Sequence, residues 1–145
     1  MLRPCITTMA LISVFCTLGC GDENPATFEV TGTVVFKDGA PLTDGSVEFE
    51  TEVDDKPITA IGQIGPDGTF KLGTYEAADG ALPGKHRVAV FAHNEIGTKH
   101  ERPDHLPPLV LDPRFSNFIT SKLEFTVKEE GKNDFRIEVE RIPED

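Results

Sequence analysis

Apolar and polar residues alternate with a period of two along most of this chain, and no apolar period of 3.6 extends over a helical length. The first such run places Phe28, Val30, Gly32, Val34 and Phe36 on one face of an extended segment. Successive side chains of a strand point to opposite sides of its sheet, so this alternation is typical of strands with one buried face. The pattern therefore predicts an all-β fold.

Further strands are predicted between segments rich in Gly, Pro and Asp, the residues that tight turns prefer. They cover 45–50, 58–64, a strand that begins at Phe70, 86–91, and two final strands around Phe125 and Ile137. The turn 65–68 predicts a hairpin between its flanking strands, and residues 51–57 are predicted to form a charged loop. About seven short strands of this kind predict a single seven-stranded β-sandwich with Greek-key connections over residues 28–142.

Residues 1–19 have the composition of a signal peptide. Arg3 gives the segment a positive start, residues 6–16 are mainly apolar, and Gly19 closes it. The apolar part is shorter than the roughly 20 apolar residues that a membrane-spanning helix needs, and it fits the apolar centre of a cleaved signal. We expect a signal peptide over 1–19 and, after it, a flexible polar tether over 20–27.

Gly19 and Cys20 resemble the cleavage box of bacterial lipoproteins, in which a small residue precedes the cysteine that receives the lipid. Thr17 stands where Leu is usual in that box, and Cys16 is a second, less well placed acceptor. Cleavage before Cys20 removes both Cys5 and Cys16, which leaves one thiol in the mature chain. A free thiol is a liability in an oxidising compartment, and lipidation removes it. We therefore expect lipidation at Cys20; an ordinary secretory signal that is cleaved beside a chance cysteine is the alternative.

The chain has 25 acidic and 14 basic residues, which gives a formal net charge of -11. Such a surface repels nucleic acid and anionic lipid head groups, so we expect no nucleic-acid partner and a membrane contact only through the lipid anchor. Gly21, rather than an Asp, follows the lipidation cysteine, and by analogy this favours the outer membrane or the cell surface. Within the cell envelope, the partner expected for a tethered sandwich is a protein, a peptide or a glycan.

Several groups of residues resemble carboxypeptidase-regulatory-like and transthyretin-like domains. They are the segments 30–42, 45–49, 66–72 and 82–88. His86 occupies a position where those domains frequently have an aromatic residue. In order and spacing the mature chain is similar to the small transthyretin-like lipoproteins of planctomycete-type bacteria, with a departure at Lys122, where they tend to have Gly before the strand. The resemblance implies a prealbumin-like sandwich in the cell envelope and implies no reaction.

No motif in the sequence points to catalysis, and we expect no enzyme activity and no cofactor. Hydroxyisourate hydrolases of the transthyretin fold end in Tyr-Arg-Gly-Ser, whereas residues 140–145 of this chain read Glu-Arg-Ile-Pro-Glu-Asp. No serine lies in a Gly-x-Ser-x-Gly motif, and no glycine-rich phosphate loop or pair of zinc-binding cysteines occurs. The expected function is that of a non-catalytic binding or structural module.

Metal binding through the segment 93–105 is the alternative function. His93, His100 and His105 lie on one proline-rich connection, and imidazole groups with nearby carboxylates suit Zn²⁺ or Cu²⁺. Their spacing matches none of the tight ligand pairs of zinc sites, so solvated loop histidines are the simpler interpretation. The carboxylates of residues 54 and 55 suit Ca²⁺, but in the absence of a calcium-loop motif they too are interpreted as solvated.

Overall fold

A computed structural model of the protein describes residues 24–93 and 111–142. Within these residues the predicted all-β class is confirmed. The strands are β1 (Val30–Phe36), β2 (Gly45–Val53), β3 (Lys56–Ile64), β4 (Thr69–Lys71), β5 (Gly84–Phe91), β6 (Leu123–Val127) and β7 (Asn133–Val139). A single-turn 3-10 helix, η1 (Pro113–Ser116), precedes β6.

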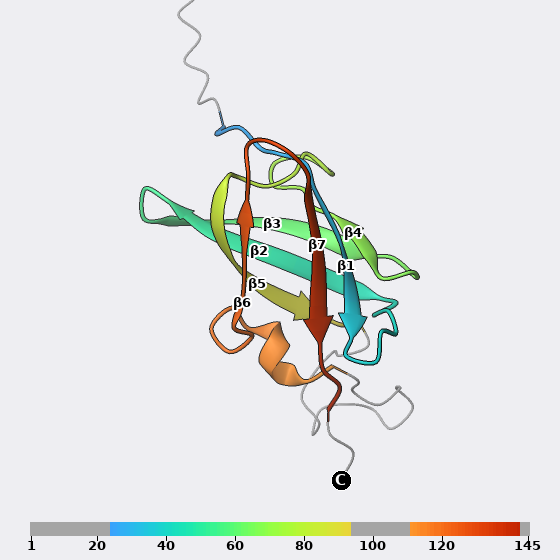
Figure 1. The fold of residues 1–145 in the computed structure, drawn as a ribbon. Helices are drawn as coiled ribbons and strands as arrows, with labels where there is room; N and C mark the ends of the chain where they lie inside the picture. Colours follow the sequence, from blue (N-terminus) through green and yellow to red (C-terminus); the bar gives the residue numbers. More distant parts are fainter. Residues whose placement is uncertain (1–23, 94–110, 143–145) are drawn as a thin grey trace, which may run out of the picture.

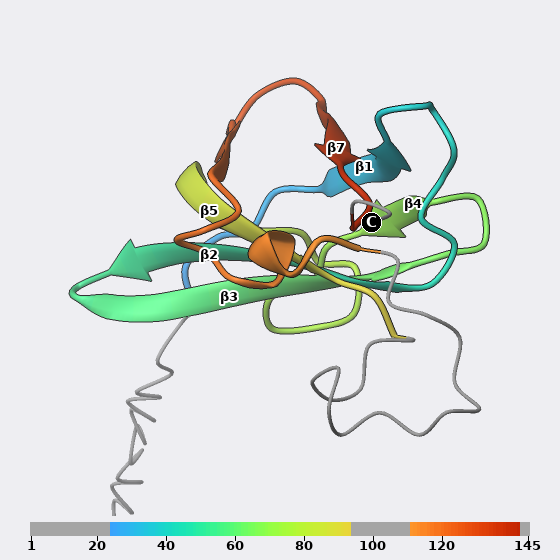
Figure 2. The ribbon, with the colours of Figure 1, turned by 90° about the horizontal axis from the view of Figure 1, so that it is seen from below.

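The strands form two sheets that pack face to face. One sheet has the strand order β4-β1-β7, and the other has the order β3-β2-β5-β6. Neighbouring strands are antiparallel except β1 and β7, which pair in parallel from Val30 opposite Asn133 to Phe36 opposite Val139. Figure 1 shows β1 and β7 side by side in front of β2 and β3, and the view from below in Figure 2 shows the sheets as separate layers.

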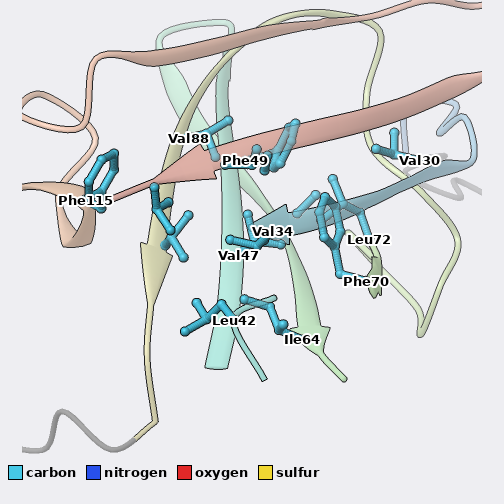
Figure 3. Close-up of a cluster of buried hydrophobic side chains, with 14 of the residues drawn as sticks. Val30, Val34, Leu42, Val47, Phe49, Ile64, Phe70, Leu72, Val88 and Phe115 are labelled. Carbon is cyan, nitrogen blue, oxygen red and sulfur yellow. The ribbon is translucent and has the colours of Figure 1, made fainter. Parts of the chain in front are cut away.

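The core fills the space between the two sheets and receives side chains from both (Figure 3). Phe49 of β2 has no exposed surface. Its ring centroid lies 6.2 Å from that of Phe70, and 5.9 Å from those of both Phe125 and Phe135. Gly32 of β1 has no room for a Cβ atom, which would meet the Phe70 ring and the Phe135 carbonyl oxygen. Aromatic rings from both sheets therefore join the layers at the centre of the sandwich.

The structure contradicts the prediction that residues 51–57 form a charged loop. It is not a loop, because β2 and β3 pair without a break up to Val53 opposite Lys56. Only Asp54 and Asp55 form the turn, with φ angles of 51° and 60°. Two consecutive left-handed residues are typical of a type I′ turn, whose twist matches that of paired strands. The alternation is weak here because β5 pairs only with the first part of β2, which leaves the tip of the ribbon with little buried surface.

The prediction of a hairpin across residues 65–68 is also wrong. The turn itself forms, and the Gly68 N–H donates to the Gly65 carbonyl at 2.9 Å. However, β3 pairs with β2 and β4 pairs with β1, so the strands that flank the turn belong to different sheets. An isolated bridge between Ile61 and Gly73 keeps the two edges together. The turn therefore carries the chain from one layer to the other.

The two ends of the sandwich differ in character. At one end the chain enters the fold at Phe28, which forms a bridge with Ala81 just before β1. At the opposite end lie η1 and the last residues of β1 and β7 (Figure 1). There the Glu140 carboxylate lies 2.7 Å from the Lys37 ammonium and 2.6 Å from the Arg114 guanidinium. Hydrogen bonds from both cations lower the pKa of Glu140. At this end of the sandwich, ion pairs therefore connect the residue after β7 with the residue after β1 and with η1.

Candidate functional site

Of the predicted site residues, the structure places only His93. Cys20, which is expected to carry the lipid, lies outside the described residues, as do His100 and His105. Nδ1 of His93 lies 2.9 Å from Oδ1 of Asp44, and both side chains are about half exposed. Within the described ranges, no three His, Cys, Asp or Glu side chains are grouped closely enough to hold a metal ion.

The contact between Asp44 and His93 could not be seen in the sequence. Asp44 directly precedes β2 and His93 follows β5, and these strands are antiparallel neighbours, so the two ends meet. A carboxylate bound to Nδ1 fixes the orientation of the imidazole ring and directs Nε2 away from the carboxylate. The arrangement is suited to one metal ligand, and any further ligands would have to come from elsewhere in the chain.

The outer face of the four-stranded sheet carries two contrasting rows of side chains. The first row is charged: Glu50 of β2 lies opposite Arg87 of β5, which lies opposite Glu124 of β6. The Arg87 guanidinium is 2.7 Å from the Glu50 carboxylate, and the Lys85 ammonium is 2.8 Å from the Glu124 carboxylate. These charges compensate one another, and exposed pairs of this kind contribute at most about 1 kcal/mol each.

The neighbouring row is mostly apolar. Glu48 of β2 lies opposite Ile61 of β3 on one side and opposite Ala89 of β5 on the other. Ala89 has no exposed surface, whereas Ile61 is 47% exposed. Next to Ala89, the turn after η1 adds the half-buried Phe118 and Ile119, and the latter is 76% exposed. We refer to Glu48, Ile61, Ala89, Phe118 and Ile119 together as the apolar band.

Glu48 is the charged residue of the apolar band. Burial raises the pKa of the Glu48 carboxyl, and the negative charge of Glu50 raises it further. Within the part of the chain that the structure describes, no cation or hydrogen-bond donor contacts this carboxylate. Glu50, two residues along the same strand, is paired with Arg87. The alternation pattern alone does not distinguish the two glutamates, because both are outward residues of β2.

His86 of β5 is a titratable residue inside the core. Its side chain is 1% exposed, and its ring centroid lies 6.0 Å from that of Phe49. The Gly84 carbonyl accepts a hydrogen bond from Nδ1 at 3.0 Å. Burial lowers the pKa of His86, and the hydrogen bond to Gly84 offsets only part of that effect. A neutral imidazole in this position packs against Phe49 as one of the rings of the core.

The loop between β4 and β5 is organised by one carboxylate. Oδ1 of Asp79 accepts the Thr74 N–H at 2.6 Å, and Oδ2 accepts the N–H groups of Tyr75 and Glu76, both at 3.1 Å. Desolvation acts to raise the pKa of Asp79, but the three backbone donors outweigh it and the pKa is lowered. Asp79 is therefore a structural residue, because backbone donors already occupy both of its oxygens.

No family model, curated protein or solved structure matches this chain. Among the described residues, no helix has the length and apolar character needed to cross a membrane. Three features of the chain itself bear on function. They are the apolar N-terminal sequence that ends in Gly19 and Cys20, the Asp44–His93 pair and the apolar band.

Proposed function

We propose that this protein is a cell-envelope lipoprotein, anchored by lipid on Cys20, whose β-sandwich is a non-catalytic binding or structural module. The observation that carries the proposal is the pair Gly19 and Cys20, which follows an apolar segment and precedes a polar one. The fold supports it, because the chain enters the sandwich at one end, at Phe28. Residues 20–27 span at most about 28 Å when extended, so the anchor holds that end of the domain close to the lipid.

We further propose that the sandwich is a seven-stranded Greek-key fold of the prealbumin-like type, as the resemblance implies. The chain passes between the sheets after β1, β3, β4 and β6, and connections of this kind are frequent in Greek-key sandwiches. Lys122 adds a local argument. Its φ of 55° lies in the left-handed region that favours glycine, which is the residue that the similar lipoproteins tend to have there.

The intact mass of the protein extracted from membranes tests the anchor. We expect a chain that begins at residue 20 and carries a lipid-sized increment in mass. Cys20→Ala should abolish the increment and the retention on membranes, whereas the matched control Cys16→Ala should change neither. An unmodified wild-type mass, or release of the wild-type protein into the soluble fraction, would identify a secreted sandwich without an anchor and refute the proposal.

Metal binding is the second candidate function, and the Asp44–His93 pair is the observation that favours it. Metal-binding histidines in proteins commonly donate one ring N–H to a carboxylate, which orients the other nitrogen toward the metal. The 2.9 Å contact between Asp44 and Nδ1 of His93 makes Nε2 the ligand atom. In this proposal His100 and His105 supply the further imidazoles.

Thermal unfolding with and without Zn²⁺ or Cu²⁺ tests the second candidate. Binding to the folded state raises the melting temperature by mass action. The double variant His93→Ala, His100→Ala should lose that increase, and Asp44→Asn should reduce it. Glu138→Gln, on the outer face of β7, is the matched control for loss of a surface carboxylate. An unchanged wild-type melting temperature with both metals would exclude this function.

A further inference from the structure

The apolar band lies where the outer face of a sheet is normally polar. An antiparallel sheet usually packs one face on the core and leaves the other solvated. Here Ile61 and Ile119 expose apolar surface on the solvated side, with Ala89 buried between them. A hollow of about 390 Å³, bordered by charged side chains, lies beside Phe118 and Ile119. Exposed apolar side chains that lie on both sides of a partly buried carboxylate and are rimmed by charged groups are found at interaction sites, whereas apolar residues scattered singly over a surface need no such explanation.

The turn that presents Ile119 is firmly built. The Asn117 side-chain oxygen accepts the Ile119 N–H at 2.8 Å and the Thr120 N–H at 3.3 Å. Ser121 donates its hydroxyl to the Val88 carbonyl at 2.6 Å, which fixes the turn to the edge of β5. These hydrogen bonds hold in place the large apolar side chain that, among the described residues, has the greatest exposure. An ordered turn displaying an apolar side chain to water is a feature that a binding partner would use.

Glu48 indicates the chemistry of that partner. Its carboxylate is partly removed from water, and the neighbouring cation Arg87 is already paired with Glu50. A partly desolvated anion without a counter-ion is stabilised when a bound partner supplies a cation. Charge complementarity therefore points to a basic group above Glu48. The flanking Ile61 and Ile119 point to apolar groups on both sides of that cation.

We propose that the apolar band is a docking surface for a protein segment that presents an arginine or lysine between apolar side chains. Glu48 receives the cation, and Ile61 and Ile119 contact the flanking apolar groups. The inference rests on the proposed role of the sandwich as a binding module and names the class of its partner. Because the chain enters the fold at Phe28, at one end of the sandwich, the tether does not have to cross this face.

An NMR titration of the ¹⁵N-labelled protein, purified from membranes in detergent, tests the proposal. The probe is the capped peptide acetyl-Leu-Arg-Leu-amide, and the matched probe acetyl-Leu-Gln-Leu-amide lacks only the positive charge. We expect saturable shifts of the amide signals of Glu48, Ile61 and Ala89 with the arginine peptide. The glutamine peptide should bind about tenfold more weakly, as for the loss of one partly desolvated charge pair.

Three variants assign the effect to the band. Glu48→Gln retains the shape of the side chain. It should weaken binding of the arginine peptide about tenfold, so that the two peptides bind equally well. Ile119→Ser removes an apolar contact, and it should weaken the binding of both peptides. Glu138→Gln removes an exposed carboxylate from the other sheet, and it should leave the binding of both peptides unchanged.

Equal binding of the two peptides, or an arginine preference that survives Glu48→Gln, would overturn the proposal. Shifts of the band that grow with protein concentration in the absence of peptide would show that a second copy covers it. Shifts that follow the lipid added to the detergent would assign the surface to lipid; either result also overturns the proposal. The titration does not depend on the lipid on Cys20, so its failure leaves the intact-mass result unaffected. Conversely, an unlipidated wild-type protein that binds the arginine peptide would support the docking surface and refute the lipid anchor.

Discussion

Replacing the buried His86 with phenylalanine should remove a defined part of the pH dependence of stability. Burial lowers the pKa of His86 in the folded protein, whereas an imidazole in an unfolded chain titrates near pH 6.5. Below about pH 6.5 the unfolded state therefore binds a proton that the folded state does not. The stabilising contribution of the neutral ring is complete above that pH, and it is lost progressively as the pH falls toward the folded-state pKa.

The surroundings of His86 determine the size of this effect. The side chain is 1% exposed, and within the described chain the Gly84 carbonyl is its hydrogen-bond partner. A proton that is bound only by the unfolded state changes the free energy of unfolding by about 1.4 kcal/mol per pH unit. From about pH 7.5 to 5.5, integration over the unfolded-state titration gives a loss of up to about 1.4 kcal/mol, reached when the folded ring stays neutral throughout.

Urea unfolding followed by circular dichroism at several pH values between about 7.5 and 5.5 measures this loss. His86→Phe should flatten the dependence of the unfolding free energy on pH, because phenylalanine packs against Phe49 and does not titrate. Val88→Ile overpacks the same strand but retains His86, so it should lower stability at every pH and leave the slope unchanged. Carboxylates, including Glu48, titrate in all three proteins and cancel in the comparison. Equal slopes for the wild type and His86→Phe would refute a buried neutral histidine.

Three further predictions concern stability alone. Lys122→Gly should raise the free energy of unfolding by about 0.5–1 kcal/mol in thermal unfolding, because it relieves a left-handed backbone, whereas Lys122→Ala should bring no such gain. Asp79→Ala should lower it by about 1–2 kcal/mol in urea, since three backbone donors lose their acceptor; an unchanged midpoint would contradict this role. Phe49→Ala should cost about 3–5 kcal/mol, because it leaves a cavity among the rings that join the sheets, and a loss below about 1 kcal/mol would show that the core collapses around it.

The all-β class was predictable because the alternation of inward and outward residues is a local property of each strand. The same signal was misleading at the ribbon tip, where residues 51–57 have little buried surface and were interpreted as a loop. At residues 65–68 the turn chemistry was correct and the pairing was wrong. Turn residues determine where the chain reverses, but the sheet that the next strand joins depends on partners far away in the sequence.

The candidate site was less predictable because its contacts are non-local. His93 was selected from the sequence, but its partner Asp44 lies 49 residues away, and only the pairing of β2 with β5 brings them together. Glu48 and Glu50 have equivalent positions in the alternation. The register places Arg87 opposite Glu50 and Ala89 opposite Glu48, so one carboxylate is paired and the other is left in apolar surroundings. Such a difference arises only when strands from separate parts of the chain are aligned.

The parallel pairing of β1 and β7 has a mechanical consequence. Both strands run from the end where the chain enters toward the opposite end, in register over seven residues. A pull between the start of β1 and the end of β7 therefore acts along the ladder and loads its hydrogen bonds together, in shear. A pair pulled from the same end would instead open like a zipper, one bond after another. Because resistance to a pulling force depends on the rate of unfolding, a ladder whose hydrogen bonds are loaded together should resist the force better than one that opens bond by bond. In the lipoprotein proposed above, this geometry would transmit tension from the anchor to a load at the far end of the domain.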